Sequence, residues 1–261
     1  MIEVKNLKKQ FEDIEVLKGI STVFETGKTN LIIGQSGSGK TVFLKSMTGL
    51  ITPTSGEILF DGRDTTKFSY EERQKLRGEI GTVFQGSALF DSMTVLENVR
   101  FPLEMFSDLS MKEMNMRSEE VLERVNLTKE SFSKFPSEIS GGMQKRVAIA
   151  RAIVNKPKYL FADEPNSGLD PKTSMVIDQL LQELTVEYNT TTIINTHDMN
   201  SVMEIGETIV FLKDGFLEWS GDKNEILTAD NEAVIDFVYS SKLFTKLREV
   251  LLEEKDNSNK K

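Results

Sequence analysis

A glycine-rich loop between an apolar run and a helical segment constrains the fold of this chain most. Residues 34–41 read GQSGSGKT and match the pattern GxxxxGK[ST]. The apolar run Asn30–Ile33 precedes the loop, and a helical segment, 42–47, follows it. Glycines let backbone amides turn inward, and a helix N-terminus attracts anions. This order predicts a strand, a phosphate-binding loop and a helix within an α/β fold.

The loop predicts a site for nucleotide phosphates and Mg²⁺. We expect Lys40 to contact the β- and γ-phosphates and the Thr41 hydroxyl to bind Mg²⁺. A glycine-rich turn with a chance lysine is the alternative, and the strand and helix on the correct sides argue against it. The residues expected at the nucleotide are Gly34, Gln35, Ser36, Gly37, Ser38, Gly39, Lys40, Thr41 and Val42.

Further short apolar runs predict a sheet that is covered on both faces. Most of these runs are continuous and not alternating, as in buried parallel strands. The segment 86–151 breaks this rhythm with helical periodicity, at 119–125 and at Met143–Val154, and we interpret it as a helical insertion in an α/β core. The expected strands are Asn30–Ile33, Gly81–Phe84, Tyr159–Ala162, Thr192–Asn195 and Thr208–Phe211.

An acidic pair, Asp163 and Glu164, closes the run Tyr159–Ala162. The carboxyl ends of parallel strands are where open α/β sheets bind ligands. Phosphoryl transfer needs a carboxylate that orients the metal and a group that handles the attacking water. We therefore expect Asp163 to orient Mg²⁺ and Glu164 to act as general base. The alternative is an acidic pair that merely ends a strand before Pro165.

Two more polar residues end predicted strands. His197, the single histidine, follows a β-branched run, and we expect it to contact the γ-phosphate or position the water. A lone histidine is otherwise more often a solvated or satisfied core residue. Gln85 follows Gly81–Phe84, and its amide can reach Mg²⁺ or the water and also swing away. We count both among the catalytic residues, and Gln85 also among the metal ligands.

Composition excludes several function classes. The net charge is −9, so the basic footprint of a nucleic-acid-binding protein is absent and we expect no nucleic-acid partner. The chain has no cysteine, and hence no disulfide or thiolate metal site. No apolar run approaches the roughly 18 residues of a membrane-spanning helix, and the N-terminus lacks the apolar region of a signal peptide. Any membrane role is therefore expected to come through a partner.

A second anion site is predicted around residue 140. Ser140, Gly141 and Gly142 open a helical segment, so a hydroxyl, free amides and a helix N-terminus come together. One phosphate loop does not need a second anion site. Taken with the other motifs, this segment resembles the signature of the nucleotide-binding domains of ABC transporters.

The resemblance covers residues 1–222, because the phosphate loop, Gln85, the signature segment Ile139–Met143, Asp163-Glu164, Ser167–Asp170 and His197 occur in the family order. It implies a P-loop NTPase core with a mixed sheet and an inserted α-helical subdomain. It also implies ATP hydrolysis with Mg²⁺ by two copies that sandwich two ATP molecules.

The same resemblance implies further site residues. Phe11 is similar to the aromatic residue that stacks on adenine, supported by Val16, and Asp170 to the residue that communicates across the dimer. Ser140, Gly141, Gly142 and Gln144 would close over the γ-phosphate of the opposite copy. Met143 departs from the family, because many members have glutamine there.

Residues 85–99, with the Ser-Gly-Gly-Met segment, resemble the ATPase of Mla-type phospholipid transporters. The implied partners are an integral membrane permease, received in a groove of the insertion, and a lipid-binding periplasmic subunit. The implied location is the cytoplasmic face of the inner membrane. The alternatives are ordinary variation in a coupling loop, an importer ATPase for amino acids, metals or another polar solute, and a non-transport ABC ATPase of translation or DNA repair.

The remaining expectations concern methionines and the C-terminal end. Four methionines of the insertion (Met105, Met111, Met114 and Met116) fit a helical core better than an adaptable partner surface. Residues 223–261 are expected to form a helical extension, at 233–238 and 243–252, with a frayed polar end. This extension either crosses the homodimer or caps its own domain.

Overall fold

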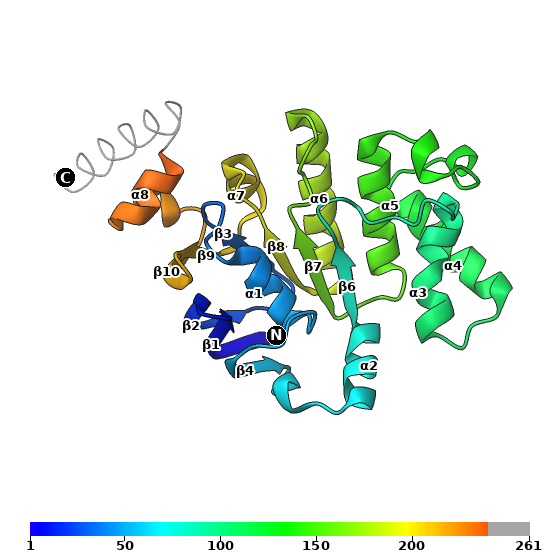
Figure 1. Cartoon of the computed structure of the whole chain (residues 1–261). Coiled ribbons are helices and arrows are strands. Elements are labelled where there is room, and N and C mark those ends of the chain that lie inside the picture. Colours follow the sequence, from blue (N-terminus) through cyan, green and yellow to red (C-terminus); the bar gives the residue numbers. More distant parts are fainter. Residues whose placement is uncertain (240–261) are drawn as a thin grey trace.

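Two β-sheets carry the fold. The structure is a computed structural model that describes residues 1–239. One sheet is antiparallel, in the order β2-β1-β4-β5, and the other has six strands in the order β10-β9-β3-β8-β7-β6 (Figure 1). The strands are β1 (Ile2–Phe11), β2 (Ile14–Phe24), β3 (Thr29–Ile33), β4 (Ser55–Phe60), β5 (Arg63–Asp64), β6 (Ile80–Val83), β7 (Tyr159–Asp163), β8 (Thr191–Asn195), β9 (Thr208–Lys213) and β10 (Phe216–Gly221).

Helices flank the six-stranded sheet and form a separate group beyond β6 (Figure 1). The α-helices are α1 (Lys40–Met47), α2 (Tyr70–Glu79), α3 (Val95–Phe106), α4 (Met111–Arg124), α5 (Gly141–Ile153), α6 (Pro171–Tyr188), α7 (Met199–Ile205) and α8 (Glu232–Val238). Short 3₁₀ turns lie at Thr65–Lys67, Lys129–Ser131, Pro136–Glu138 and Ile226–Thr228. No helix among residues 1–239 is long and apolar enough to cross a bilayer.

The predicted α/β core with an inserted helical subdomain is confirmed. Strands β9, β3, β8, β7 and β6 pair in parallel, and β10 adds an antiparallel edge, so the large sheet is mixed. Every residue of β3, β7 and β8 is buried, as their continuous apolar runs predict. The helices α3, α4 and α5 make up the insertion.

The central sheet separates two hydrophobic cores. Leu31 and Ile33 of β3 belong to a cluster shared with the helices, whereas Ile32 belongs to a cluster shared with the antiparallel sheet. Successive side chains of a strand point to opposite faces, so one buried strand serves both cores. The phosphate loop after β3 is thereby anchored from both sides.

The antiparallel sheet was not predicted from the sequence. Its strands β1 and β2 alternate apolar residues with lysine and glutamate, and their register shifts at three places. Such bulges break the strict period of two that identifies a strand in a sequence. Of the two predicted C-terminal helices, 233–238 corresponds to α8; 243–252 and the polar end lie outside the described residues.

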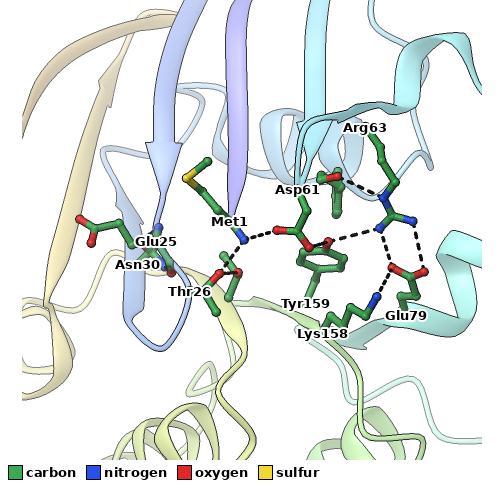
Figure 2. A network of polar contacts seen from close by, with 11 residues as sticks. Met1, Glu25, Thr26, Asn30, Asp61, Arg63, Glu79, Lys158 and Tyr159 are labelled. Carbon is green, nitrogen blue, oxygen red and sulfur yellow. Dashed lines mark hydrogen bonds and ion pairs between the residues drawn. The ribbon is translucent and has the colours of Figure 1, made fainter.

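A polar network ties the antiparallel sheet to the start of β7 (Figure 2). The Tyr159 hydroxyl donates to the Asp61 carboxylate at 2.5 Å, and the amino group of Met1 donates to the same carboxylate at 2.7 Å. Arg63 pairs with Glu79 through two hydrogen bonds of 3.2 and 2.7 Å. Burial and the hydrogen bond to Asp61 raise the pKa of the Tyr159 phenol, which therefore stays a donor.

We expect Tyr159→Phe to lower the free energy of unfolding by about 1 kcal/mol, because a buried donor to a carboxylate is lost while the ring packing remains. Urea unfolding followed by circular dichroism measures this change. Tyr70→Phe is the control, because Tyr70 is 67% exposed and its loss should cost at most about 0.5 kcal/mol. Equal stability of the two variants would contradict the role of the network.

Candidate nucleotide-binding and hydrolysis site

The carboxyl ends of β3, β7 and β8 bring the predicted site together. These strands pair in parallel, with Asp163 opposite Asn195 and Ile32 opposite Asn195. The residues that follow each strand therefore emerge at one edge of the sheet. The phosphate loop, the acidic pair and the segment that carries His197 meet there.

The phosphate loop is tightly packed at its first residue and has free space around its middle. Gly34 has φ +149°, and a Cβ there would lie 2.3 Å from the Leu212 carbonyl oxygen of β9, so only glycine fits. A Cβ on Gly37 would meet nothing within 4 Å. The Ser38 hydroxyl is buried and has no hydrogen-bond partner within the described part of the chain. An open loop with an unsatisfied buried hydroxyl fits a phosphate ligand.

Lys40 lies across this loop. Its ammonium donates to the carbonyl oxygens of Gly34 at 2.8 Å and of Gln35 at 3.0 Å. Burial lowers the pKa of Lys40, and the carboxylates of Glu164 and Asp163 oppose this effect. Its two hydrogen bonds to loop carbonyls hold the side chain across the centre of the loop.

The residues expected to hold Mg²⁺ supply a suitable donor set. The Thr41 hydroxyl lies 3.4 Å from an Asp163 oxygen, which also accepts a hydrogen bond of 3.0 Å from the Asn195 amide. Gln85 and Thr41 line one cavity, and Asp163, behind Thr41, does not line it. Hydroxyl, carboxylate and amide oxygens suit Mg²⁺, which is typically held by one or two carboxylates together with substrate phosphates. Asn195 was not predicted from the sequence, because its role depends on its pairing opposite Asp163.

Glu164 and His197 contact each other. The His197 Nδ1 lies 2.6 Å from the nearer carboxylate oxygen of Glu164. Glu164 has φ +51°, a left-handed conformation that a non-glycine residue adopts at a cost in free energy. Its backbone N–H donates to the Asn195 carbonyl, which helps to hold this conformation. When Nδ1 donates to the carboxylate, Nε2 is left for a ligand or water.

One cavity of about 800 Å³ gathers most of the predicted nucleotide and catalytic residues. Its lining residues are Val16, Gln35, Ser36, Gly37, Gly39, Lys40, Thr41, Val42, Gln85, Glu164, His197 and Phe237. Phe11 is not among them; it is 42% exposed, and the Lys9 ammonium lies 4.6 Å from its ring centre. Phe237 of α8 was missed by the sequence analysis, because nothing in its local pattern marks it as part of a site.

The loop after β6 connects the cavity to the helical subdomain. The Gln85 amide donates to the Ser167 hydroxyl at 3.3 Å, and the Lys145 ammonium donates to the Gln85 carbonyl. Arg151 donates to the carbonyl oxygens of Ser87 and Ala88. Both cations lie on α5, and the sequence did not mark them, since their partners are carbonyls 60 or more residues away.

The signature residues do not line the cavity of their own chain. Ser140 caps α5 by accepting from the Met143 N–H at 3.3 Å, and the Gln144 amide donates to the Pro136 carbonyl at 2.9 Å. Asp170 caps α6, and its hydrogen bonds with Thr173 lower the pKa of its carboxyl group. Gly141 and Gly142 form the first turn of α5. The two predicted anion sites of one chain therefore do not share a cavity.

The expectation for the methionines of the insertion is largely wrong. Met114 is buried, but Met105, Met111 and Met116 are 59%, 52% and 61% exposed. They lie on the solvent sides of α3 and α4, because the apolar positions that pack into the core there are taken by valine and leucine.

Comparison with protein families shows what the chain is similar to. Residues 17–167 match the family model described as ABC transporter. A probable ribonucleotide transport ATP-binding protein, mkl, of Mycobacterium leprae is 36% identical over 237 residues, which are 91% of this chain and 68% of that protein. The chain thus spans about two thirds of the length of this relative. The lipoprotein-releasing system ATP-binding protein LolD of Buchnera aphidicola is 41% identical, over 78% of this chain and 91% of its own.

Solved structures of ABC transporter proteins are also similar to this chain. The dimeric structure of MJ0796, a bacterial ABC transporter cassette, has a TM-score of 0.79 and 38% identity, and it covers 85% of this chain and 99% of its own. A dimeric post-hydrolysis state of the same cassette, bound to ADP and Pi, matches with a TM-score of 0.79 and 37% identity. CbiO1 of Clostridium perfringens, part of the transporter complex cbiONQ, has a TM-score of 0.81 and 31% identity, over 96% of this chain and 98% of its own.

We expect Lys40→Ala to abolish measurable nucleotide binding and turnover together, because the cation at the centre of the phosphate loop is removed. Equilibrium binding of a fluorescent ATP analogue measures the affinity. Lys45→Ala, in the last turn of the same helix, is the matched control and should bind as the unmodified chain does. Unchanged binding by Lys40→Ala would contradict the site.

Proposed function

This chain belongs to the ABC transporter family as an ATP-hydrolysing member, and from that premise we propose that two copies close on two ATP molecules and drive a membrane permease. The observation that carries the proposal is the contact between Glu164 and His197 in the cavity that Lys40 and Thr41 line. The residues proposed as the base, the phosphate-binding cation and the metal-binding hydroxyl thus line one cavity.

The proposed dimer follows from the separation of the two anion sites. One chain supplies the phosphate loop and Glu164, whereas its own Ser140 site lies elsewhere. A second copy supplies the missing half, with Ser140, Gly141, Gly142 and Gln144 of the partner subunit over the γ-phosphate. The matching MJ0796 cassette is dimeric. Asp170, at the start of α6, then lies between the copies and communicates across the dimer.

The proposed chemistry uses the residues of the cavity in named roles. Glu164 accepts a proton from water as the water oxygen attacks the γ-phosphorus, and the bond to the bridging oxygen breaks to leave ADP and phosphate. His197, with a proton on each ring nitrogen, donates to the Glu164 carboxylate through Nδ1 and to a γ-phosphate oxygen through Nε2. Thr41, Asp163 and Gln85 would hold Mg²⁺, which when bound neutralises charge on the phosphates. Phe11 and Val16 would hold the adenine ring.

A groove between the helical subdomain and the core around β6 supports a permease partner. It has a volume of about 340 Å³ and is lined mainly by apolar side chains, with Phe84, Phe90 and Phe106 between 36% and 42% exposed. Ala88 and Phe90 line this groove, and Gln85, three residues from Ala88, lines the nucleotide cavity. A permease segment that enters the groove therefore acts on the loop that reaches the nucleotide.

We propose a phospholipid as the cargo, and a lipid-binding periplasmic subunit as a further partner. The support is the likeness of residues 85–99 and of Met143 to Mla-type ATPases, together with a relative whose name refers to lipoprotein release. This chain would then lie at the cytoplasmic face of the inner membrane, bound through its permease. Residues 1–222 would form the ATPase domain and 223–261 a C-terminal extension.

The second candidate is an importer of a polar solute. It is favoured by a methionine import ATP-binding protein, MetN, of Carboxydothermus hydrogenoformans, which is 40% identical over 82% of this chain and 64% of its own. The fold and the cavity are equally suited to both candidates, because the cargo is bound by other subunits.

We expect Glu164→Gln to retain ATP binding and to lose about 10² to 10⁴ in turnover, because general-base help is removed. ATP should then hold the variant as a stable dimer, which gel filtration with light scattering detects. Glu183→Gln is the control, since Glu183 lies on the exposed surface of α6 and pairs there with Arg124 of α4. Normal turnover by Glu164→Gln would contradict the assignment of Glu164 as the general base of ATP hydrolysis.

We expect a phospholipid and a permease to copurify with this chain from gently solubilised native membranes. Mass spectrometry of the proteins and lipids identifies both. A permease accompanied by a soluble solute-binding protein, and no phospholipid above the level of a mock purification, would replace the lipid cargo by the importer alternative.

A further inference from the structure

A buried carboxylate lies behind the Glu164–His197 pair. Asp178 of α6 is 3% exposed. One of its oxygens accepts a hydrogen bond of 2.7 Å from the Asn166 amide, and the other accepts one of 2.7 Å from the Ser201 hydroxyl. The Asn166 amide also lies 3.2 Å from the Ser201 hydroxyl. Three side chains from three segments thus form one closed cluster.

The two donors belong to the segments that carry the hydrolysis pair. Asn166 comes two residues after Glu164, in the loop between β7 and α6. Ser201 comes four residues after His197, in the first turns of α7. The carboxylate of Asp178 therefore fixes the distance between the continuation of β7 and the continuation of β8.

This carboxylate is costly to keep. Burial is the main reason that the pKa of Asp178 rises to about 6, and the acidic Asp198, which caps α7, and Glu204 within α7 raise it further. The hydrogen bonds from Ser201 and Asn166 act in the opposite direction. A buried charge needs hydrogen bonds from its neighbours, and Asp178 receives one at each oxygen.

The geometry that the cluster supports is a strained one. Glu164 has its left-handed backbone conformation immediately before the loop that Asn166 anchors. Such a conformation persists only where surrounding contacts determine it. On one side Glu164 is held by the Asn195 carbonyl, and on the other its loop is held by Asp178.

We propose that Asp178 is a positioning residue for ATP hydrolysis, which through Asn166 and Ser201 keeps Glu164 and His197 in contact. The inference rests on the proposed function of that pair. Asp178 itself does not line the nucleotide cavity. Asp178 determines the position of the Glu164 carboxylate and leaves the phosphate loop unchanged.

The first test compares ATPase kinetics of Asp178→Ala with the unmodified full-length chain. Misplacement of a catalytic group by about 1 Å can cost roughly a hundredfold. We therefore expect kcat to fall at least about tenfold, with KM for ATP within about twofold. The number of ATP-binding sites per chain, titrated in parallel, should be unchanged, which separates misplacement from partial unfolding.

A matched control lies one residue further along α6. The Gln179 amide also bridges α6 to α7, through Glu204 at 3.1 Å, but on the exposed surface and without contact to Asn166. Gln179→Ala should retain the kcat of the unmodified chain. An equal loss of kcat in both variants would show that any link between the two helices is enough, and would overturn the proposal.

The second test uses pH and an isosteric variant, so that it does not depend on the folding of Asp178→Ala. Asn at 178 presents one oxygen where the carboxylate presents two, so Asp178→Asn should have a lower kcat at pH 7.5. As pH falls through about 6, Asp178 takes up a proton, and the two proteins should converge by pH 5. Glu164, His197, Asp198 and Glu204 are common to both proteins, so the ratio of the two kcat values isolates Asp178.

The outcomes separate this inference from the proposed function. If the unmodified chain hydrolyses ATP and Glu164→Gln does not, the proposed site stands. A kcat ratio for Asp178→Asn that stays constant between pH 5 and 7.5, or an unchanged kcat for Asp178→Ala, then overturns the role of Asp178 alone. If Glu164→Gln hydrolyses ATP normally, the proposed function itself fails.

Discussion

Parallel pairing of three fully buried strands is the constraint on which the site depends. Strand β8 lies between β3 and β7, and each of the three is followed by a segment that carries part of the proposed chemistry. Their register places Asp163 opposite Asn195, so the amide of one strand orients the carboxylate of the next. A slip by one residue would turn these side chains to the other face of the sheet. The hydrophobic cores on both faces fix the register, and through it the positions of Asp163, Glu164 and His197.

Those parts of the fold and site that depend on local patterns could be predicted from the sequence. Continuous apolar runs gave the buried strands, and the loop motif placed Lys40 and Thr41, because local order decides both. The antiparallel sheet was not predicted, because its strands carry charged residues on one face and their pairing contains bulges. The sequence analysis also missed three residues, Asn195, Arg151 and Phe237, for another reason. Their partners lie far away in the sequence, so only folding brings each residue to its partner.

The exposed methionines show the same limit. Their spacing on α3 and α4 suits a helical core, yet only Met114 packs into it. Which face of an amphipathic helix is buried depends on the helices that pack against it, and those contacts are not visible in one segment of sequence. Met105, Met111 and Met116 are left on the surface of the subdomain that forms one side of the proposed permease groove.

One apolar cluster runs without interruption from the groove-bearing helices to the central sheet. It contains Val99 of α3, Val147 of α5, and Leu160 and Ile194 of the parallel strands. Close-packed interiors have low compressibility and transmit strain. A displacement imposed on α3 is therefore expected to pass through packed side chains to the strands that carry the site. Since the inserted helices and the central sheet share one hydrophobic core, we expect them to unfold together and not as separate units.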